Sequence, residues 1–170
     1  HSRFQQIMPP HGDQSSAYDD VITGGATDDY LFGEAGNDTI DGGAGADFVS
    51  YASGSTTSGV NINLVTGLVT GGSGNDVISN IEYLEGSMFD DTIVGNAGGN
   101  YINARAGNDT IDGGAGNDRV AYINATGAVT VSLVTNTSSG PDGNDTLINI
   151  ENLRGSNYND LLIGDGGAND

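Results

Sequence analysis

The stretch GGATDDYLFGEAGNDTIDGGAGADFVS at residues 24–50 decides the fold, because it contains three consecutive nine-residue units. In each unit glycine recurs near the start, aspartate stands at the sixth position and an aliphatic residue at the eighth. Glycine tolerates the positive φ angles of tight turns, and the last three residues alternate as in a β-strand. Each unit therefore predicts a tight turn followed by a short strand. One such unit cannot close a core, so the units must stack.

The predicted turn carries the donor atoms that calcium prefers. Calcium binds six to eight oxygens from carboxylates and carbonyls, and a tight glycine turn brings several carbonyls close to its aspartate. Stacking would place successive carboxylates about 4.7–4.9 Å apart, where two unit charges repel by about 0.8 kcal/mol even at the dielectric constant of water. A cation between neighbouring turns would remove this repulsion. We therefore expect cation binding and folding to be coupled.

Composition narrows the possible partners of the chain. Its 170 residues include 29 Gly, 23 Asp or Glu and only 4 Lys or Arg, which gives a formal net charge of −19. This excess of acid argues against nucleic acids and anionic membrane surfaces, which are bound through Lys and Arg. The chain has no Cys, so disulfides and thiolate metal sites are excluded. Aromatic residues make up 6% of the chain and Trp is absent, so repetition must supply the burial of a conventional core.

The glycine- and aspartate-rich units resemble the repeats-in-toxin (RTX) family, also called haemolysin-type calcium-binding repeats. The resemblance covers residues 15–170 and implies an all-β fold, a right-handed parallel β-roll in which two nonapeptide half-coils make one coil. It also implies several Ca2+ ions, each between turns that stack on the same edge about 18 residues apart in sequence.

Two regions and a longer repeat are expected along the chain. Residues 1–14 lack the repeat and are expected to be a linker or the tail of a preceding domain, in which His1 and His11 have no partner at useful spacing. Within 15–170, NIEYLE at 80–85 recurs as NIENLR at 149–154. These motifs are 69 residues apart, so the roll has a super-repeat of about 70 residues.

The segments 51–70 and 122–139 lose the nonapeptide frame but retain strand alternation, for example at Val60, Ile62 and Leu64. We expect one continuous roll with occasional stretched or shortened turns. Whether the super-repeat returns to the same edge of the roll depends on whether 150–153 is a loop or a strand, and the sequence allows both.

The eighth position of each unit predicts the core. These positions are all aliphatic, which a random Gly- and Asp-rich sequence would not produce. They are Ile22, Leu31, Ile40, Val49, Ile78, Ile93, Ile102, Ile111, Val120, Leu147 and Leu162.

The sixth-position acids are the predicted metal ligands: Asp20, Asp29, Asp38, Asp47, Asp76, Asp91, Asp109, Asp118, Asp145 and Asp160. The RTX resemblance adds backbone carbonyls, which would fall on Gly33, Ala35, Asn37, Gly42, Ala44, Gly113, Ala115 and Asn117. Asn100 and Asn169 replace the aspartate, so their sites are expected to be weak or empty. Other acids have simpler roles: Asp19, Asp28 and Asp90 are expected to cap their own turns, and Asp41 and Asp112 to be solvated on the outside.

The resemblance implies a calcium-binding module that folds when it meets calcium outside a bacterial cell. It would act as folding trigger, scaffold or spacer in a type I-secreted protein, at an extracellular or cell-surface location. The alternative is the non-catalytic C-terminal part of a secreted enzyme, such as a protease, lipase or epimerase, or of an adhesin. The sequence contains no His-Glu-x-x-His and no Gly-x-Ser-x-Gly, so we expect no enzymatic activity in this chain.

An outward face of the roll could bind ice or dock a neighbouring domain. Ice binding would need a regular outward array, whereas the outward seventh positions vary, as Tyr30, Thr39 and Phe48 show. An aromatic cluster of Tyr30, Phe32 and Phe48 is expected on one outward face, where it would dock a neighbouring domain of the parent chain.

Overall fold

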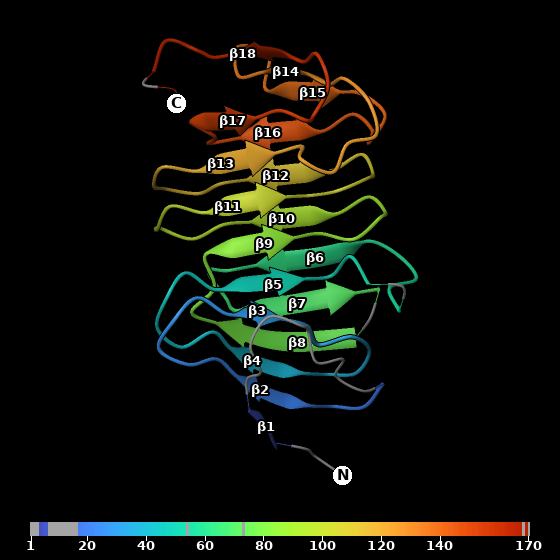
Figure 1. Ribbon diagram of the computed structural model, residues 1–170, viewed down its shortest axis with the longest axis vertical. Helices are drawn as coiled ribbons and strands as arrows, with labels where there is room; N and C mark the ends of the chain where they lie inside the picture. Colours follow the sequence, from blue (N-terminus) through green and yellow to red (C-terminus); the bar gives the residue numbers. More distant parts are fainter. Residues whose placement is uncertain (1–3, 7–16, 54, 73, 168, 170) are drawn as a thin grey trace.

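The computed structural model describes residues 4–6, 17–53, 55–72, 74–167 and 169. These residues form β-strands and turns with no helix, as the nonapeptide pattern predicts. Accordingly, no helix long and apolar enough to cross a membrane is found in the described ranges. Figure 1 shows the strands stacked along the long axis of the molecule in two sheets.

The described strands form a twelve-stranded first sheet and a six-stranded second sheet. In spatial order, the first sheet contains β1 (Phe4–Gln6), β2 (Val21–Thr23), β4 (Thr39–Asp41), β8 (Gly74–Ser79), β7 (Leu68–Gly71), β6 (Val60–Asn63), β10 (Thr92–Val94), β12 (Thr110–Asp112), β16 (Thr146–Ile148), β15 (Thr137–Ser139), β14 (Thr130–Ser132) and β18 (Leu161–Ile163). The second contains β17 (Asn152–Arg154), β13 (Arg119–Ala121), β11 (Tyr101–Asn103), β9 (Tyr83–Glu85), β5 (Phe48–Ser50) and β3 (Tyr30–Leu31).

The nonapeptide strands pair in parallel with the strand one coil further on, which confirms the β-roll. In the first sheet β10 pairs with β12, so that Ile93 lies opposite Ile111. In the second sheet β11 pairs with β13, and Ile102 lies opposite Val120. Each coil takes one strand from each sheet, and the eighth-position side chains of both sheets stack in the space between them.

The predicted core is largely confirmed. Nine of the predicted residues are buried and Ile22 packs against them while partly buried. Leu162 was predicted wrongly, because its side chain is 41% exposed. It lies in β18, the last strand of the first sheet, which pairs only with β14. The buried tyrosines Tyr51 and Tyr122 belong to the core but lie outside the eighth-position pattern.

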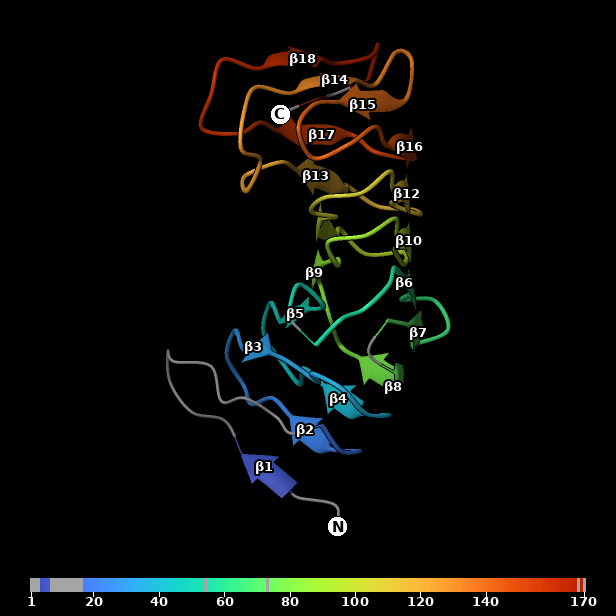
Figure 2. The same cartoon turned by 90° about the vertical axis from the view of Figure 1, so that its right-hand side faces the viewer.

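The off-frame segments each continue the roll with one strand, because β6 pairs in parallel with β10 and β14 with β18. An antiparallel strand, which the sequence analysis did not predict, is inserted beside each of them. β7 pairs antiparallel with both β6 and β8, and β15 does the same between β14 and β16. The reversals use residues with positive φ: Gly67 (69°) after β6 and Asn136 (58°) after β14. Because the insertions add strands to the first sheet alone, the two sheets differ in length, and the stack changes direction near β6–β8 (Figure 2).

Equivalent strands of the two 70-residue cycles lie in the same sheet. Residues of 150–153 contribute to the strand β17, which lies in the second sheet. The equivalent strands β10 and β18 both lie in the first sheet, so each cycle returns to the same face.

At the N-terminal end of the first sheet, β1 pairs in parallel with β2. Residues 4–6, which were expected to lie in a linker or tail, thus extend the first sheet. The rest of 1–14, with His1 and His11, lies outside the described residues.

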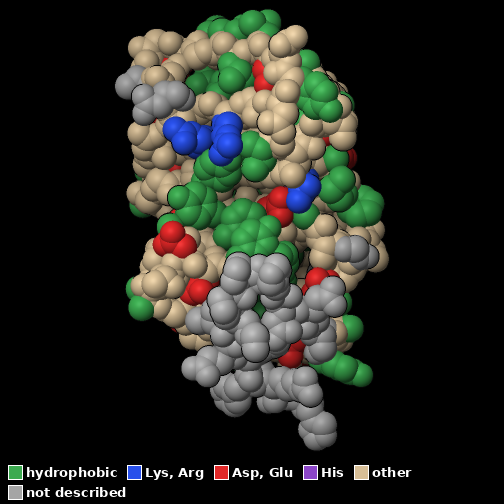
Figure 3. Space-filling view, in the orientation of Figure 1, with side chains coloured by type: hydrophobic (Ala, Val, Ile, Leu, Met, Phe, Trp, Pro, Cys, Tyr) green, Lys and Arg blue, Asp and Glu red, His purple; other side chains and the backbone are tan. Residues whose placement is uncertain are grey.

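An aromatic row crosses the outer face of the second sheet. Tyr30 stacks on Phe48 with ring centroids 4.2 Å apart and contacts Phe32 at 4.7 Å, which confirms the predicted cluster. Tyr83 and Tyr101 continue the row at 5.5 Å. Figure 3 shows this face, where hydrophobic side chains gather along the middle beside basic ones and acidic side chains form small separate patches.

We predict that the inward column stabilises the roll only where coils cover it on both sides. Ile93→Ala should lower the free energy of unfolding by about 2–5 kcal/mol, because Ile93 is fully buried. Leu162→Ala, at the equivalent position of the next cycle, should cost under about 1 kcal/mol, because this side chain is partly solvated. Urea unfolding at saturating calcium measures both. Equal losses would show that Leu162 is covered in solution.

Candidate metal centre

The sixth-position acids form two columns, one along each edge of the roll, because each lies just before or within a strand of one sheet. The first column belongs to the first sheet, and its members precede their strands except Asp76, which lies within β8. It contains Asp20, Asp38, Asp76, Asp91, Asp109, Asp145 and Asp160. The second column contains Asp29, Asp47 and Asp118, together with Asn100. Asn169 is the sixth position of the unit after β18. Most of the aspartates in these columns are buried.

A ladder of hydrogen bonds aligns the carboxylates of each column. The backbone N–H of one sixth-position residue donates to Oδ1 of its counterpart in the next coil. Asp20 donates to Asp38 at 2.8 Å and Asp29 to Asp47 at 2.8 Å, and Asp91 donates to Asp109 at 2.8 Å. One oxygen of each accepting carboxylate is thereby fixed against the neighbouring turn.

Four of these carboxylates have a second oxygen without any donor. Among the described residues, Oδ2 of Asp38, Asp47, Asp109 and Asp118 is buried and makes no hydrogen bond. We call their turns, 33–38, 42–47, 104–109 and 113–118, the open loops. A buried carboxylate oxygen without a partner is costly, and a cation would satisfy it.

The open loops share a backbone conformation with positive φ at the second and fourth positions. The second positions are Glu34 (63°), Gly43 (92°), Arg105 (76°) and Gly114 (93°), and the fourth are Gly36 (141°), Gly45 (141°), Gly107 (148°) and Gly116 (142°). This conformation turns the second-position N–H away from the carboxylate, which is why Oδ2 is left without a donor.

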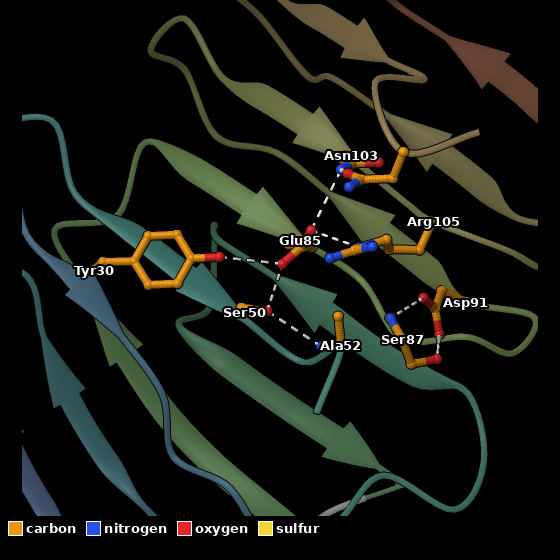
Figure 4. Close-up of polar contacts among 9 residues, drawn as sticks. Tyr30, Ser50, Ala52, Glu85, Ser87, Asp91, Asn103 and Arg105 are labelled. Atoms are coloured by element: carbon orange, nitrogen blue, oxygen red, sulfur yellow. Dashed lines mark hydrogen bonds and ion pairs between the residues drawn. The ribbon is translucent and has the colours of Figure 1, made fainter. Parts of the chain in front are cut away.

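Five other nonapeptide turns in the described part of the chain close on their own sixth-position side chain. In these self-capped loops the second-position N–H donates to the sixth-position side chain, from Gly25 to Asp29 at 2.6 Å and from Ser87 to Asp91 at 2.7 Å (Figure 4). Asp160, Asn100 and Asn169 accept the same bond from Ser156, Asn96 and Asp165. The sequence contains a signal for this difference, because self-capped loops lack either glycine at the fourth position or aspartate at the sixth.

A third arrangement occurs in the insertions. Oδ2 of Asp145 accepts hydrogen bonds from Tyr122 Oη at 2.8 Å and Ser138 Oγ at 2.7 Å, and Oδ1 accepts from Asp109 N at 3.0 Å. Protein donors therefore reach both oxygens of this carboxylate. The nonapeptide pattern gives no signal for the tyrosine.

Burial and neighbouring carboxylates make the open-loop acids hard to ionise without a metal. Burial, with the charges of Asp76 and Asp20, raises the pKa of Asp38 to about 6. Burial, with the charges of Asp145 and Asp91, raises the pKa of Asp109 to about 8. A cation in these loops would favour the ionised carboxylates.

Backbone carbonyls also converge between stacked loops. A Cβ on Gly24 would lie 1.8 Å from Gly42 O and 2.9 Å from Asp29 Oδ2, so only glycine leaves room for these oxygens. The carbonyl of Gly113 approaches Gly95 in the same way. Two of the predicted carbonyl ligands therefore face the space between turns. That these two carbonyls bind an ion is still a prediction, as it is for the others: Gly33, Ala35, Asn37, Ala44, Ala115 and Asn117.

No three His, Cys, Asp or Glu side chains converge on one point in the described part of the chain. A cation held here would therefore take much of its coordination from backbone carbonyls. This donor set suits a hard ion such as calcium, which accepts mixed carboxylate and carbonyl oxygens.

The roles expected of two sets of flanking acids were wrong. Asp19, Asp28 and Asp90 do not cap their own turns, because their Oδ1 atoms accept the backbone N–H of Asn37, Ala46 and Asn108 in the next coil. Asp41 and Asp112 are not merely solvated. Their Oδ1 atoms accept hydrogen bonds from Asn80 Nδ2 at 2.7 Å and from Asn149 Nδ2 at 2.8 Å.

An ion pair missed by the sequence analysis fixes one open loop to the second sheet. Arg105 Nε lies 2.5 Å from Oε1 of Glu85, which is buried in β9. Glu85 Oε2 also accepts Ser50 Oγ at 2.6 Å (Figure 4). Arg105 is the second residue of its open loop, so this contact supports the positive φ of the loop, in which Asp109 Oδ2 is buried without a donor.

The raised pKa values predict how the calcium-free protein responds to pH. Unfolded aspartate titrates near 3.8, whereas folded Asp38 and Asp109 titrate near pH 6 and 8. Between about pH 4 and 8 the folded state holds protons that the unfolded state has released, so stability falls as pH rises. Calcium-free protein should therefore show more β-structure by circular dichroism at pH 5 than at pH 8.

Saturating calcium should abolish or reverse this pH dependence, because the metal binds the ionised carboxylates. Equal or greater β-structure at pH 8 without calcium would contradict the burial of these protons in the folded state.

Comparison with known proteins agrees with the geometry. The profile of the RTX calcium-binding nonapeptide repeat matches the chain in four copies, at residues 15–49, 68–79, 85–120 and 149–170. A comparison with curated proteins found no match. The matched segments span more than half of the chain and include all four open loops. The chain therefore belongs to the RTX calcium-binding nonapeptide repeat family.

Proposed function

We propose that this chain is a calcium-responsive folding module, in which calcium binding in the loops drives formation of the β-roll. The observation that carries the proposal is the set of four buried carboxylate oxygens without donors, in Asp38, Asp47, Asp109 and Asp118. The ligands come from the sixth-position aspartates, and the open-loop members bind most strongly.

Hydrophobic burial alone is too small to fold such a roll. One nonapeptide buries a single aliphatic side chain, which contributes about 1.5–3 kcal/mol. Fixing the backbone costs about 1–2 kcal/mol for each of its nine residues, and hydrogen bonds return only part of that cost. Uncompensated buried carboxylates add to the deficit. Calcium supplies the missing free energy, because it binds the stacked loops and not the extended chain.

The coupling suits a protein that leaves the cell unfolded. Extracellular calcium modules bind with dissociation constants of about 10⁻⁴ to 10⁻³ M, so such a roll stays unfolded at low cytosolic calcium and folds outside. We therefore propose a secreted bacterial protein exported by a type I system, in which the roll serves as folding trigger, scaffold or spacer. The alternative setting is the non-catalytic C-terminal part of a secreted protease, lipase or epimerase, or of an adhesin.

In either setting the roll has a neighbouring domain to contact. The row formed by Tyr30, Phe32 and Phe48 on the second sheet is our proposed docking face for it. Stacked rings on a flat sheet provide apolar area without disturbing the metal-binding edges. The roll itself carries no catalytic role in this proposal.

The direct test is far-UV circular dichroism of calcium-free protein titrated with calcium from micromolar to ten millimolar, with magnesium as control. We expect a cooperative gain of β-signal in the range of about 10⁻⁴ to 10⁻³ M calcium. Magnesium should fail, because it holds its water and demands a regular octahedral site. A β-spectrum that forms fully without calcium would contradict the proposal.

A matched pair of variants tests whether calcium binds mainly in the open loops. Asp109→Asn removes an open-loop carboxylate and should raise the calcium midpoint by about tenfold. Asp160→Asn makes the same change in a self-capped loop, where Ser156 already occupies Oδ2, and should shift the midpoint much less. Equal shifts would show that the open loops are not special.

A further inference from the structure

Two tripeptides without glycine interrupt the second column of loops. Asn80, Ile81 and Glu82 precede β9, and Asn149, Ile150 and Glu151 precede β17. At these places the chain crosses between sheets with three residues, where the nonapeptide uses a six-residue loop. The sequence pattern assigned no metal role to either tripeptide.

Each tripeptide retains the carbonyl of the loop that it replaces. A Cβ on Gly42 would lie 2.0 Å from Asn80 O, much as one on Gly24 would lie 1.8 Å from Gly42 O. The first-position carbonyl is therefore present in the short turn. Asn80 reaches this geometry with φ of 53°, and its side-chain amide is anchored on Asp41 Oδ1 at 2.7 Å.

Each tripeptide also retains the carboxylate. The N–H of Asp47 donates to Glu82 Oε2 at 2.9 Å, and the N–H of Asp118 donates to Glu151 Oε2 at 2.8 Å. This is the bond that Asp29 N–H makes to Asp47 Oδ1 in the regular ladder. Glutamate is one methylene longer than aspartate, which offsets the shorter backbone path of the tripeptide.

Asp47 Oδ2, which has no hydrogen-bond donor, lies beside the carbonyl oxygen of Asn80. Asp47 Oδ2 would be 2.7 Å from the Gly42 Cβ that Asn80 O also approaches, so both oxygens face one small space. Asp47 is fully buried and its Oδ2 makes no hydrogen bond. The second cycle repeats the arrangement, with Asn149 O at 2.3 Å and Asp118 Oδ2 at 2.8 Å from a Cβ on Gly113.

We propose that each tripeptide is a minimal calcium-binding turn. Glu82, the Asn80 carbonyl and Asp47 Oδ2 supply oxygens to one divalent cation, and Glu151, Asn149 and Asp118 supply them to another. A carbonyl and a carboxylate oxygen that face one space, with a second carboxylate bonded to the same aspartate's N–H, suit a hard cation of charge +2. The inference rests on the proposed function, because it extends calcium binding to residues outside the glycine pattern.

The test counts calcium ions bound to the full chain by equilibrium dialysis at millimolar calcium. Glu82→Gln and Glu151→Gln keep side-chain length and remove the charge. Each single variant should bind one ion fewer than the unaltered protein, and the double variant two fewer. Asp165→Asn is the control: it removes one carboxylate charge outside the proposed ligands, where Asp165 Oδ1 accepts the N–H of Gly167 at 2.7 Å, so the ion count should not change.

If the double variant binds the same number of ions with the same affinity, the tripeptide proposal is overturned. Calcium binding by the unaltered protein would still support the proposed function in that case. Failure of the unaltered protein to bind calcium would instead overturn the proposed function. If the Gln variants do not fold at any calcium concentration, Glu82→Asp and Glu151→Asp retain the charge on a shorter side chain. They should bind the full number of ions, two of them at least about tenfold more weakly, and unchanged affinity would overturn the proposal.

Discussion

The structure depends on one electrostatic constraint, which is that acidic side chains stack above one another in a buried column. Backbone N–H groups align them through one oxygen, as between Asp91 and Asp109. In the open loops the other oxygen has no protein donor. Burial and like charge then raise the pKa of the acid, so the column stores unfavourable free energy that only protons or cations relieve. The strands, the core and the proposed calcium response follow from this arrangement.

Among the described turns, only the four open loops contain a buried carboxylate oxygen without a donor. Within each cycle, one open loop occurs on each edge. It is followed in the second column by a short Asn-Ile-Glu turn and in the first column by an insertion. Self-capped loops then satisfy the carboxylate with their own N–H, as Ser87 does for Asp91. Protein donors such as Tyr122 satisfy it in the insertion at Asp145. In the first column, the open loop of Asp109 is thus followed by a turn whose carboxylate, that of Asp145, has protein donors at both oxygens.

Much of this could be predicted from the sequence, because glycine turns and single inward aliphatic residues leave few alternatives. The parallel strands, the two columns and core residues such as Ile111 and Val120 follow from the nine-residue period. The insertions could not be predicted, since β7 and β15 have the alternation of any strand and only pairing reveals their direction. An open loop differs from a self-capped one in sequence, because self-capped loops lack glycine at the fourth position or aspartate at the sixth, but the nine-residue period alone does not predict whether the second-position N–H reaches the carboxylate. That depends on the φ angle of the second residue, which distant contacts such as Glu85 with Arg105 help to set.

A crystal structure of the calcium-loaded protein, with calcium located by its anomalous scattering, tests the central claim most directly. The account predicts calcium bound by Oδ2 of Asp38, Asp47, Asp109 and Asp118, with the self-capped carboxylates still bonded to their own loops. Calcium bound mainly at Asp29, Asp91 and Asp160, or no calcium at the four unpartnered oxygens, would contradict it.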